Sequence, residues 1–176
     1  MTQVELSRTM RVDTIGAEPR PMHIVASDAE RAALARRFGL VSMDRLEADV
    51  GVSRSGGDIV AAGSLSATLV QSCVATAEPV PASVAEDFQI VFRPQPQVGD
   101  PDVEVELGEG ELDVMFYDSA MVDVGEAVAQ SLALALDPYP RAPEAADTLK
   151  QAGVKDEGEA GPLGALAAAL KDKLGK

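Results

Sequence analysis

The fold is decided by the stretch Leu46-Glu-Ala-Asp-Val-Gly-Val-Ser-Arg-Ser-Gly-Gly-Asp-Ile59. In its first half every second side chain is apolar, and this period of two predicts a half-buried β-strand. The paired glycines of residues 55–58 accept positive φ angles without a steric cost, so they predict a hairpin turn. The return strand is expected over residues 59–73, and Gly63 is predicted to mark a bend or bulge in it.

The segments before this hairpin predict one strand and one helix. Residues 5–14 alternate weakly and are expected to form a first strand. Ser27 and Glu30 match a capping box, in which the serine side chain accepts a hydrogen bond from the backbone three residues on. Apolar residues then recur at helical spacing up to Gly39, which predicts a helix over residues 28–38.

After the hairpin the sequence predicts more strands. Pro79 and Pro81 are expected to break the return strand, because proline cannot donate to a β-ladder. The next strand is predicted over residues 84–92. Residues 103–107 are then expected to pair with residues 112–116 across a turn that contains two glycines.

The C-terminal third predicts two helices of different character. A second possible capping box opens a helix over about residues 123–136 that is apolar almost all round and should be buried against the sheet. Residues 143–161 have no period and predict a flexible linker. Residues 162–174 return to helical spacing and predict a short amphipathic helix. The predicted organisation is therefore one domain over residues 1–142, the linker, and this helix.

Together these expectations give an α+β fold. It would consist of an antiparallel β-sheet or a partly closed barrel, packed with one or two helices, plus a tethered C-terminal amphipathic helix. The 176 residues hold 46% apolar residues but only four Phe, two Tyr and no Trp, so the core must be aliphatic. A single cysteine, Cys73, excludes an intramolecular disulfide framework and a cysteine-based zinc site.

The formal net charge is −14, and one part of the chain holds all of it. Residues 43–126 contain 17 Asp and Glu against 3 Lys and Arg, which gives −14 for this part alone. From Asp100 to Glu126 there is no lysine or arginine. A negative field repels phosphate and attracts basic partners, so the composition indicates the class of partner.

The carboxylates of the predicted hairpin would lie along one strand face. Three interpretations stay open: a solvated strand face, a docking surface for a basic protein, or a calcium or magnesium site. A metal site would need carboxylates that converge in a particular loop order, and here they alternate along a strand instead. The predicted docking face comprises Asp100, Asp102, Glu104, Glu106, Glu109, Glu111 and Asp113.

No catalytic constellation is visible in the sequence. Cys73 as a nucleophile would need a base, and the one histidine, His23, lies fifty residues away, so a strand-end cysteine and a loop histidine are the preferred interpretations. Glycine-rich phosphate loops are absent. We predict no catalytic, cofactor-binding or metal-binding residues, no cofactor, and a protein that is not an enzyme. The enzyme alternative is a metal-dependent hydrolase that uses the carboxylates.

Direct nucleic-acid binding has a weaker basis in the sequence. Non-specific affinity for nucleic acid comes mainly from clustered Lys and Arg. The best basic spot is Arg31, Arg36 and Arg37 on the first predicted helix, which could be a solvated face or could touch RNA locally.

The terminal helix offers a second candidate contact through Leu163, Leu166 and Leu170. A short amphipathic segment on a linker can present a groove-binding peptide, or it can fold back onto its own domain. The chain start lacks the pattern of a signal peptide, and the longest apolar run is about half a membrane span. We therefore expect a soluble cytoplasmic protein of bacteria that does not contact membranes.

Three stretches resemble the YceD-like family of large ribosomal RNA subunit accumulation proteins. The first runs from Gly63 through Cys73 to the Glu-Pro-Val of residues 78–80, followed by Phe88-Gln-Ile-Val-Phe92. The second, residues 123–141, resembles the alphaproteobacterial branch. The tail Gly-Pro-Leu-Gly-Ala-Leu of residues 161–166 resembles the closing Asn-Pro-Phe-Ala-x-Leu motif of the family, with departures at the first and third positions.

The resemblance implies a non-enzymatic factor needed for normal accumulation of large-subunit ribosomal RNA. Many relatives carry a second cysteine where this chain has Thr76, and an arginine where it has Ala75, so a structural turn suits this chain better than a thiol or metal role. The leading hypothesis is a ribosome-assembly factor whose acidic face binds a basic ribosomal protein or a large-subunit precursor, with the terminal helix as a second contact. The alternative is direct RNA binding through the three arginines.

Overall fold

The computed structural model describes residues 5–95, 113–117 and 120–154. The chain divides into two compact units. The first consists of Met1–Gln71 with Pro81–Pro138, and the second of Ser72–Val80 with Tyr139–Lys176. Each unit is described by itself.

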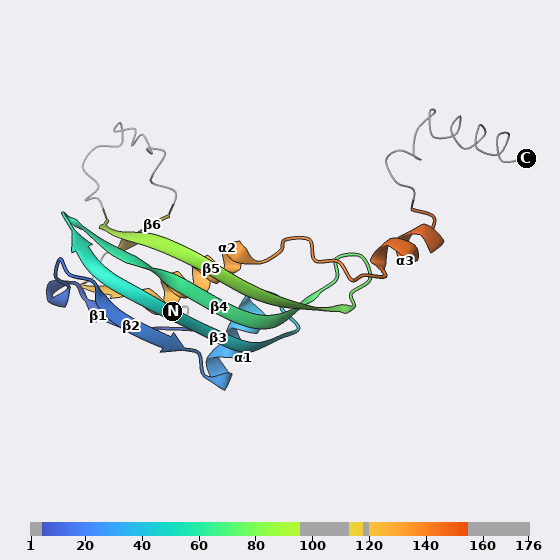
Figure 1. The fold of residues 1–176 in the computed structure, drawn as a ribbon, viewed down its shortest axis with the longest axis horizontal. Coiled ribbons are helices and arrows are strands. Elements are labelled where there is room, and N and C mark those ends of the chain that lie inside the picture. Colours follow the sequence, from blue (N-terminus) through green and yellow to red (C-terminus); the bar gives the residue numbers. More distant parts are fainter. Residues whose placement is uncertain (1–4, 96–112, 118–119, 155–176) are drawn as a thin grey trace, which may run out of the picture. The chain divides into compact units, whose positions relative to one another are not determined.

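A five-stranded sheet with the order β2-β3-β4-β5-β6 is the main element of the fold (Figure 1). The strands β2 and β3, and β3 and β4, are antiparallel, whereas β5 and β6 are parallel. A second, two-stranded sheet pairs β1 with β7. The strand bounds are β1 Thr9–Arg11, β2 Arg20–Val25, β3 Ser42–Ser55, β4 Asp58–Ser72, β5 Pro79–Pro94, β6 Val114–Tyr117 and β7 Met121–Asp123, and a 3₁₀ turn η1 spans Val12–Thr14.

The hairpin of β3 and β4 confirms the prediction made from residues 46–59. Its register runs from Ser42 opposite Val70 to Ser55 opposite Asp58, and Gly56 takes the positive φ of +60° that the turn requires. The β3–β4 pair has no bulge at Gly63, because its only irregularity lies between Met43 and Arg45. A bend of β4 at Gly63 stays a prediction.

Gly63 allows the backbones of β3 and β4 to approach closely. A Cβ atom placed there would lie 2.0 Å from the backbone oxygen of Asp49 on β3. No other residue fits this position without separating β3 from β4.

Both predicted helices of the first unit are confirmed. Helix α1, Asp28–Arg37, begins with the complete capping box of Ser27 and Glu30. Helix α2, Val124–Ala135, begins at Asp123, whose side chain accepts from the backbone N–H groups of Gly125 and Glu126. The second capping box is not completed by Glu126, because this carboxylate binds Arg37 on α1.

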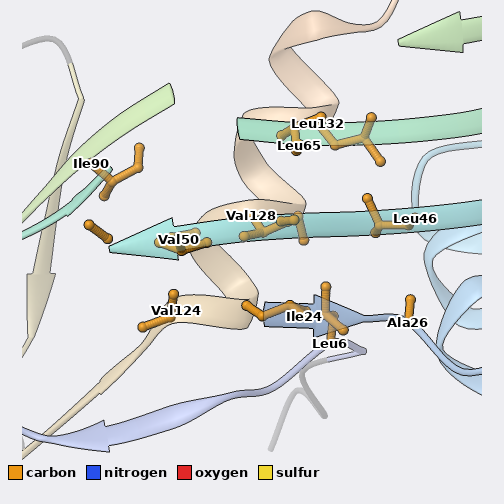
Figure 2. Close-up of a cluster of buried hydrophobic side chains, with 14 of the residues drawn as sticks. Leu6, Ile24, Ala26, Leu46, Val50, Leu65, Ile90, Val124, Val128 and Leu132 are labelled. Atoms are coloured by element: carbon orange, nitrogen blue, oxygen red, sulfur yellow. The ribbon is translucent and has the colours of Figure 1, made fainter. Parts of the chain in front are cut away.

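The core lies between the helices and one face of the five-stranded sheet. Figure 2 shows Val124, Val128 and Leu132 of α2 beside side chains of the strands. The expected aliphatic composition is confirmed, since Leu, Ile and Val supply all the largest fully buried side chains, among them Leu6, Ile24, Leu34, Leu46, Ile59, Leu69, Val122 and Val128. The fold is α+β, with an open sheet that is not closed into a barrel.

Three strands differ from the sequence-based expectations. Residues 20–25 form the edge strand β2, so His23 lies on a strand and not in a loop. Pro79 and Pro81 do not break the sheet but begin β5. Residues 114–117 pair in parallel with β5. Their predicted hairpin partner, residues 103–107, lies outside the described part of the chain.

The second unit contains the turn around Cys73 and a short helix. Helix α3, Ala145–Gln151, lies within the segment predicted as linker. Cys73, Ala142 and Ala145 form a small buried cluster with Val80 packed against it. The predicted terminal helix over residues 162–174 lies outside the described residues.

Candidate partner-binding surface

Three carboxylates gather beside the middle of β5. Glu86 and Asp87 belong to this strand, and Asp113 directly precedes β6. All three residues are exposed. The register brings Asp113 to β5, because the Val91 N–H donates to the Asp113 carbonyl oxygen at 2.9 Å. We call Glu86, Asp87 and Asp113 the β5 acidic patch.

All three residues of the β5 acidic patch border a shallow cavity of about 270 Å³, but side chains alternate along a strand, so Glu86 shares the face of Phe88 and Ile90 whereas Asp87 lies on the other face. The floor of the cavity is apolar and comes from Phe88 and Ile90 of β5 and from Leu134 of α2. Leu134 is 78% exposed, although it lies two residues from fully buried Leu132 on the same helix. Carboxylates beside apolar side chains suit a partner that has both cationic and apolar side chains.

None of the three patch carboxylates has an ion pair or a side-chain hydrogen bond within residues 5–95, 113–117 and 120–154. An exposed carboxylate that is not neutralised keeps its full charge available to an approaching cation. The patch therefore holds three exposed carboxylates whose charge no side chain of the described residues compensates.

The neighbouring carboxylates on β3 differ in this respect. Both side-chain oxygens of Glu47 accept from Arg45, at 2.8 and 2.5 Å, and this hydrogen bonding lowers the pKa of Glu47. Asp49 lies 2.8 Å from Nδ1 of His23 on β2. Arg45, Glu47 and Asp49 line a second shallow cavity, which Glu86 and Asp87 also border. The strand β3 thus adds carboxylates whose charge is partly compensated.

The structure tests little of the docking face predicted from sequence. Asp113 is described and exposed. Asp100, Asp102, Glu104, Glu106, Glu109 and Glu111, together with Leu163, Leu166 and Leu170, lie outside the described residues. Glu86 and Asp87 were missed as site residues because two adjacent carboxylates point to opposite faces of a strand. The available signal was that β5 has no basic residue between Pro79 and Val91.

Two of the three candidate arginines of α1 are hydrogen-bonded to groups of the protein itself. Arg31 donates to the Ala26 carbonyl oxygen and to Asp28, each at 2.7 Å. Arg37 donates to both side-chain oxygens of Glu126 at 2.8 and 2.6 Å and to Glu5 at 3.0 Å, and these carboxylates raise its pKa. Arg36 is exposed and has no ion pair with the described residues.

The turn around Cys73 is closed by backbone and side-chain hydrogen bonds. The Cys73 N–H donates to the Glu78 carbonyl oxygen at 2.8 Å, and the Ala77 N–H donates to the Cys73 carbonyl oxygen at 2.9 Å. Ala77 takes a φ of +60°, which is unusual for a residue that is not glycine. The Thr76 side chain and then the Ala142 N–H lower the pKa of the buried Cys73 thiol to about 7, against the opposing effect of burial.

Two further observations concern the described residues. Within them, no three His, Cys, Asp or Glu side chains are grouped as metal ligands would be. None of their helices is long and apolar enough to cross a membrane.

Comparison with known proteins decides the family. The family model named large ribosomal RNA subunit accumulation protein YceD matches residues 61–167, which is more than half of the chain. The protein belongs to the YceD family. No curated protein and no solved structure matches the chain. Membership in the YceD family implies a role in the accumulation of large-subunit ribosomal RNA.

The YceD match covers some candidate sites and not others. It contains the Cys73 turn and the whole β5 acidic patch. The three arginines of α1 lie before its first residue. Within that turn the Thr76 side chain hydrogen-bonds the Cys73 thiol.

Proposed function

We propose that this protein is a non-enzymatic factor in large-subunit ribosome assembly that binds a basic ribosomal protein or a precursor particle. Its β5 acidic patch would form the described part of the binding surface. The residues 100–111 predicted as an acidic docking face would extend that surface, and the terminal helix would add a second contact. Family membership supports the ribosomal context.

The observation that carries this proposal is the uncompensated charge of Glu86, Asp87 and Asp113. Elsewhere in the described chain arginine neutralises carboxylates such as Glu47, Asp58 and Glu126. Charge complementarity raises encounter rates with cationic partners and rejects partners of the same sign. Ribosomal proteins are strongly basic, and this surface has the opposite sign.

The experiment is a pull-down of ribosomal proteins from lysate with the full chain at low and moderate salt. The variant Glu86→Lys/Asp87→Lys should weaken recovery about tenfold, because each exposed charge contributes roughly 0.2–1 kcal/mol and four charges change in total. The control Glu18→Lys/Glu144→Lys changes the net charge by the same amount at two other exposed positions. Equal recovery by both variants, or no ribosomal protein recovered by the parent chain, would contradict the proposal.

Direct RNA binding through Arg31, Arg36 and Arg37 is the alternative that the sequence raises. The contacts of Arg31 and Arg37 with carboxylates leave little free positive charge on this face, and this favours a protein partner. Replacing the three arginines with glutamate should then leave crosslinking to ribosomal RNA unchanged. Loss of crosslinking would support the RNA-binding alternative.

The enzyme alternative and the location are tested separately. A metal-dependent hydrolase should bind magnesium, calcium or manganese in calorimetry, and we expect a flat titration for each metal. Because large subunits are assembled in the bacterial cytoplasm, we expect the protein there. Fractionation that places it elsewhere would contradict this expectation.

A further inference from the structure

One side of β5 lacks a neighbouring strand over most of its length. β5 has sixteen residues, but β6 pairs only with Val91–Pro94. For the part of β5 before Val91, the described chain provides a neighbour on the β4 side alone (Figure 1). An edge of this kind presents backbone N–H and C=O groups to any extended chain that approaches.

The hydrogen bonds to β6 show which residues point to this open edge. The N–H groups of Val91 and Gln95 donate to the carbonyl oxygens of Asp113 and Tyr117, so odd-numbered residues face this side. Backbone groups alternate in direction along a strand. The outward-facing residues before Val91 are therefore Ser83, Ala85, Asp87 and Gln89, all of them exposed.

The same alternation explains the two prolines at the start of β5. Pro79 and Pro81 are odd-numbered, so the N–H that each lacks would point to the open edge and not to β4. They are tolerated for this reason, and they cannot donate to an added strand. The usable edge accordingly runs from Ser83 to Gln89.

The side chains beside this edge define the occupant. A strand added along it would place alternate side chains over the cavity floored by Phe88 and Leu134, and it would pass between the carboxylates of the β5 acidic patch. A second copy of this chain does not suit the edge, because pairing would bring Glu86 and Asp87 of two molecules together at a net charge of −14 each. The charge of the edge requires a basic occupant.

We propose that the β5 edge from Ser83 to Gln89 receives an extended, lysine- or arginine-containing segment of the partner protein as an added β-strand. This inference rests on the proposed function and specifies how the basic partner is held. Main-chain hydrogen bonds to Ala85, Asp87 and Gln89 supply binding, and the apolar floor and the carboxylates of the β5 acidic patch select apolar and basic side chains.

The probe is a capped peptide of alternating lysine and valine, roughly ten residues long, and the protein is the full chain. The peptide should bind and slow amide hydrogen exchange at Ala85, Asp87 and Gln89. A version methylated at every backbone nitrogen keeps the charge but cannot donate, and it should bind at least about tenfold more weakly. The variant Ala85→Pro, which places proline at an outward-facing position as Pro79 and Pro81 already are, should weaken binding by a similar factor. Ala85→Val keeps the N–H and should change affinity less than about twofold.

Each outcome decides the inference. Equal affinity for both peptides, or for Ala85→Pro and the parent chain, without protection at the edge, would overturn strand addition while leaving binding by charge intact. No binding of the unmethylated peptide at about 1 mM would also overturn the inference. The pull-down with the Glu86/Asp87 variant answers separately whether a basic partner is bound, so the two failures are distinguishable.

Discussion

Replacement of Glu30 by glutamine is expected to destabilise the protein in a pH-dependent way. The Glu30 carboxylate accepts from Arg8 Nη1 and Nη2 at 2.7 and 3.1 Å. It also accepts from the Ser27 N–H and hydroxyl at 2.8 and 2.9 Å. The pKa of Glu30 is lowered from 4.5 to about 2. The hydrogen bond from Arg8 is the main cause and those from Ser27 add to it, whereas burial acts in the opposite direction.

The magnitude follows from this pKa and from the exposure of the pair. The difference between 4.5 and about 2 corresponds to at most ~3.4 kcal/mol, at 1.36 kcal/mol per pKa unit. The side chains of Arg8 and Glu30 are 32% and 21% exposed, so solvent screens part of the interaction. We therefore expect Glu30→Gln to lower the free energy of unfolding by about 1–2 kcal/mol at pH 7.

The pH dependence has a definite sign. The pKa of Glu30 is lower in the folded state, so its stabilising effect is complete above the unfolded pKa and is lost as pH falls from about 4.5 through about 2. The difference between parent and variant should shrink to roughly two-fifths of its pH 7 value at pH 3.

Urea unfolding followed by circular dichroism at pH 7 and pH 3 measures both values. The matched control is Asp28→Asn on the same helix, because the Asp28 side chain is 98% exposed and pairs only locally with Arg31. Asp28→Asn should lower the free energy of unfolding by no more than about 0.5 kcal/mol at either pH. If the loss of unfolding free energy caused by Glu30→Gln is as large at pH 3 as at pH 7, the reasoning is refuted.

Three further predictions concern packing and the Cys73 turn. Leu132→Ala should lower the free energy of unfolding by about 2–5 kcal/mol, because Leu132 is fully buried. Leu134→Ala, at a 78% exposed position of the same helix, should lower it by less than about 0.5 kcal/mol. Equal losses of stability in urea unfolding would contradict the described packing of α2. Gly63→Ala should lower the free energy of unfolding by about 3 kcal/mol, because the alanine Cβ would lie 2.0 Å from the Asp49 backbone oxygen. An unchanged free energy of unfolding would show that β3 and β4 are not this close at Gly63. The ultraviolet absorbance of the Cys73 thiolate in the native protein should rise with pH around a midpoint near 7, and Thr76→Val should move this midpoint towards 9. A parent midpoint already near 9 would exclude the hydrogen bond.

The parts of the fold that depend on local sequence could be predicted. Ser27 and Glu30 lie three residues apart and form their capping box within one turn, and the glycine turn after β3 likewise needs only its neighbours. The edge strand β2 was missed because Pro21 and an isolated histidine disguise its pattern, and edge strands admit proline. The parallel pairing of β6 with β5 depends on contacts that no local pattern reports.

For the candidate site, the sequence named an acidic surface and Asp113 but not Glu86 and Asp87. The excess of carboxylates in residues 43–126 indicated a surface for basic partners. Which carboxylates stay uncompensated depends on where the arginines lie in the fold. Arg37 reaches Glu126 across 89 residues of sequence, and Arg93 reaches Asp58 across 35. Such pairs form only after the chain has folded, so Glu86 and Asp87 stood out only in the structure.

The pairing of β1 with β7 has a consequence for the order of events during synthesis. Thr9 lies opposite Asp123, so the first strand stays without its neighbour until most of the first unit has left the ribosome. The β3–β4 hairpin needs only its own residues and forms rapidly. Closure of the core must wait for α2, which buries Val128 and Leu132. A nascent chain stalled before these residues should expose an unfinished apolar face to chaperones.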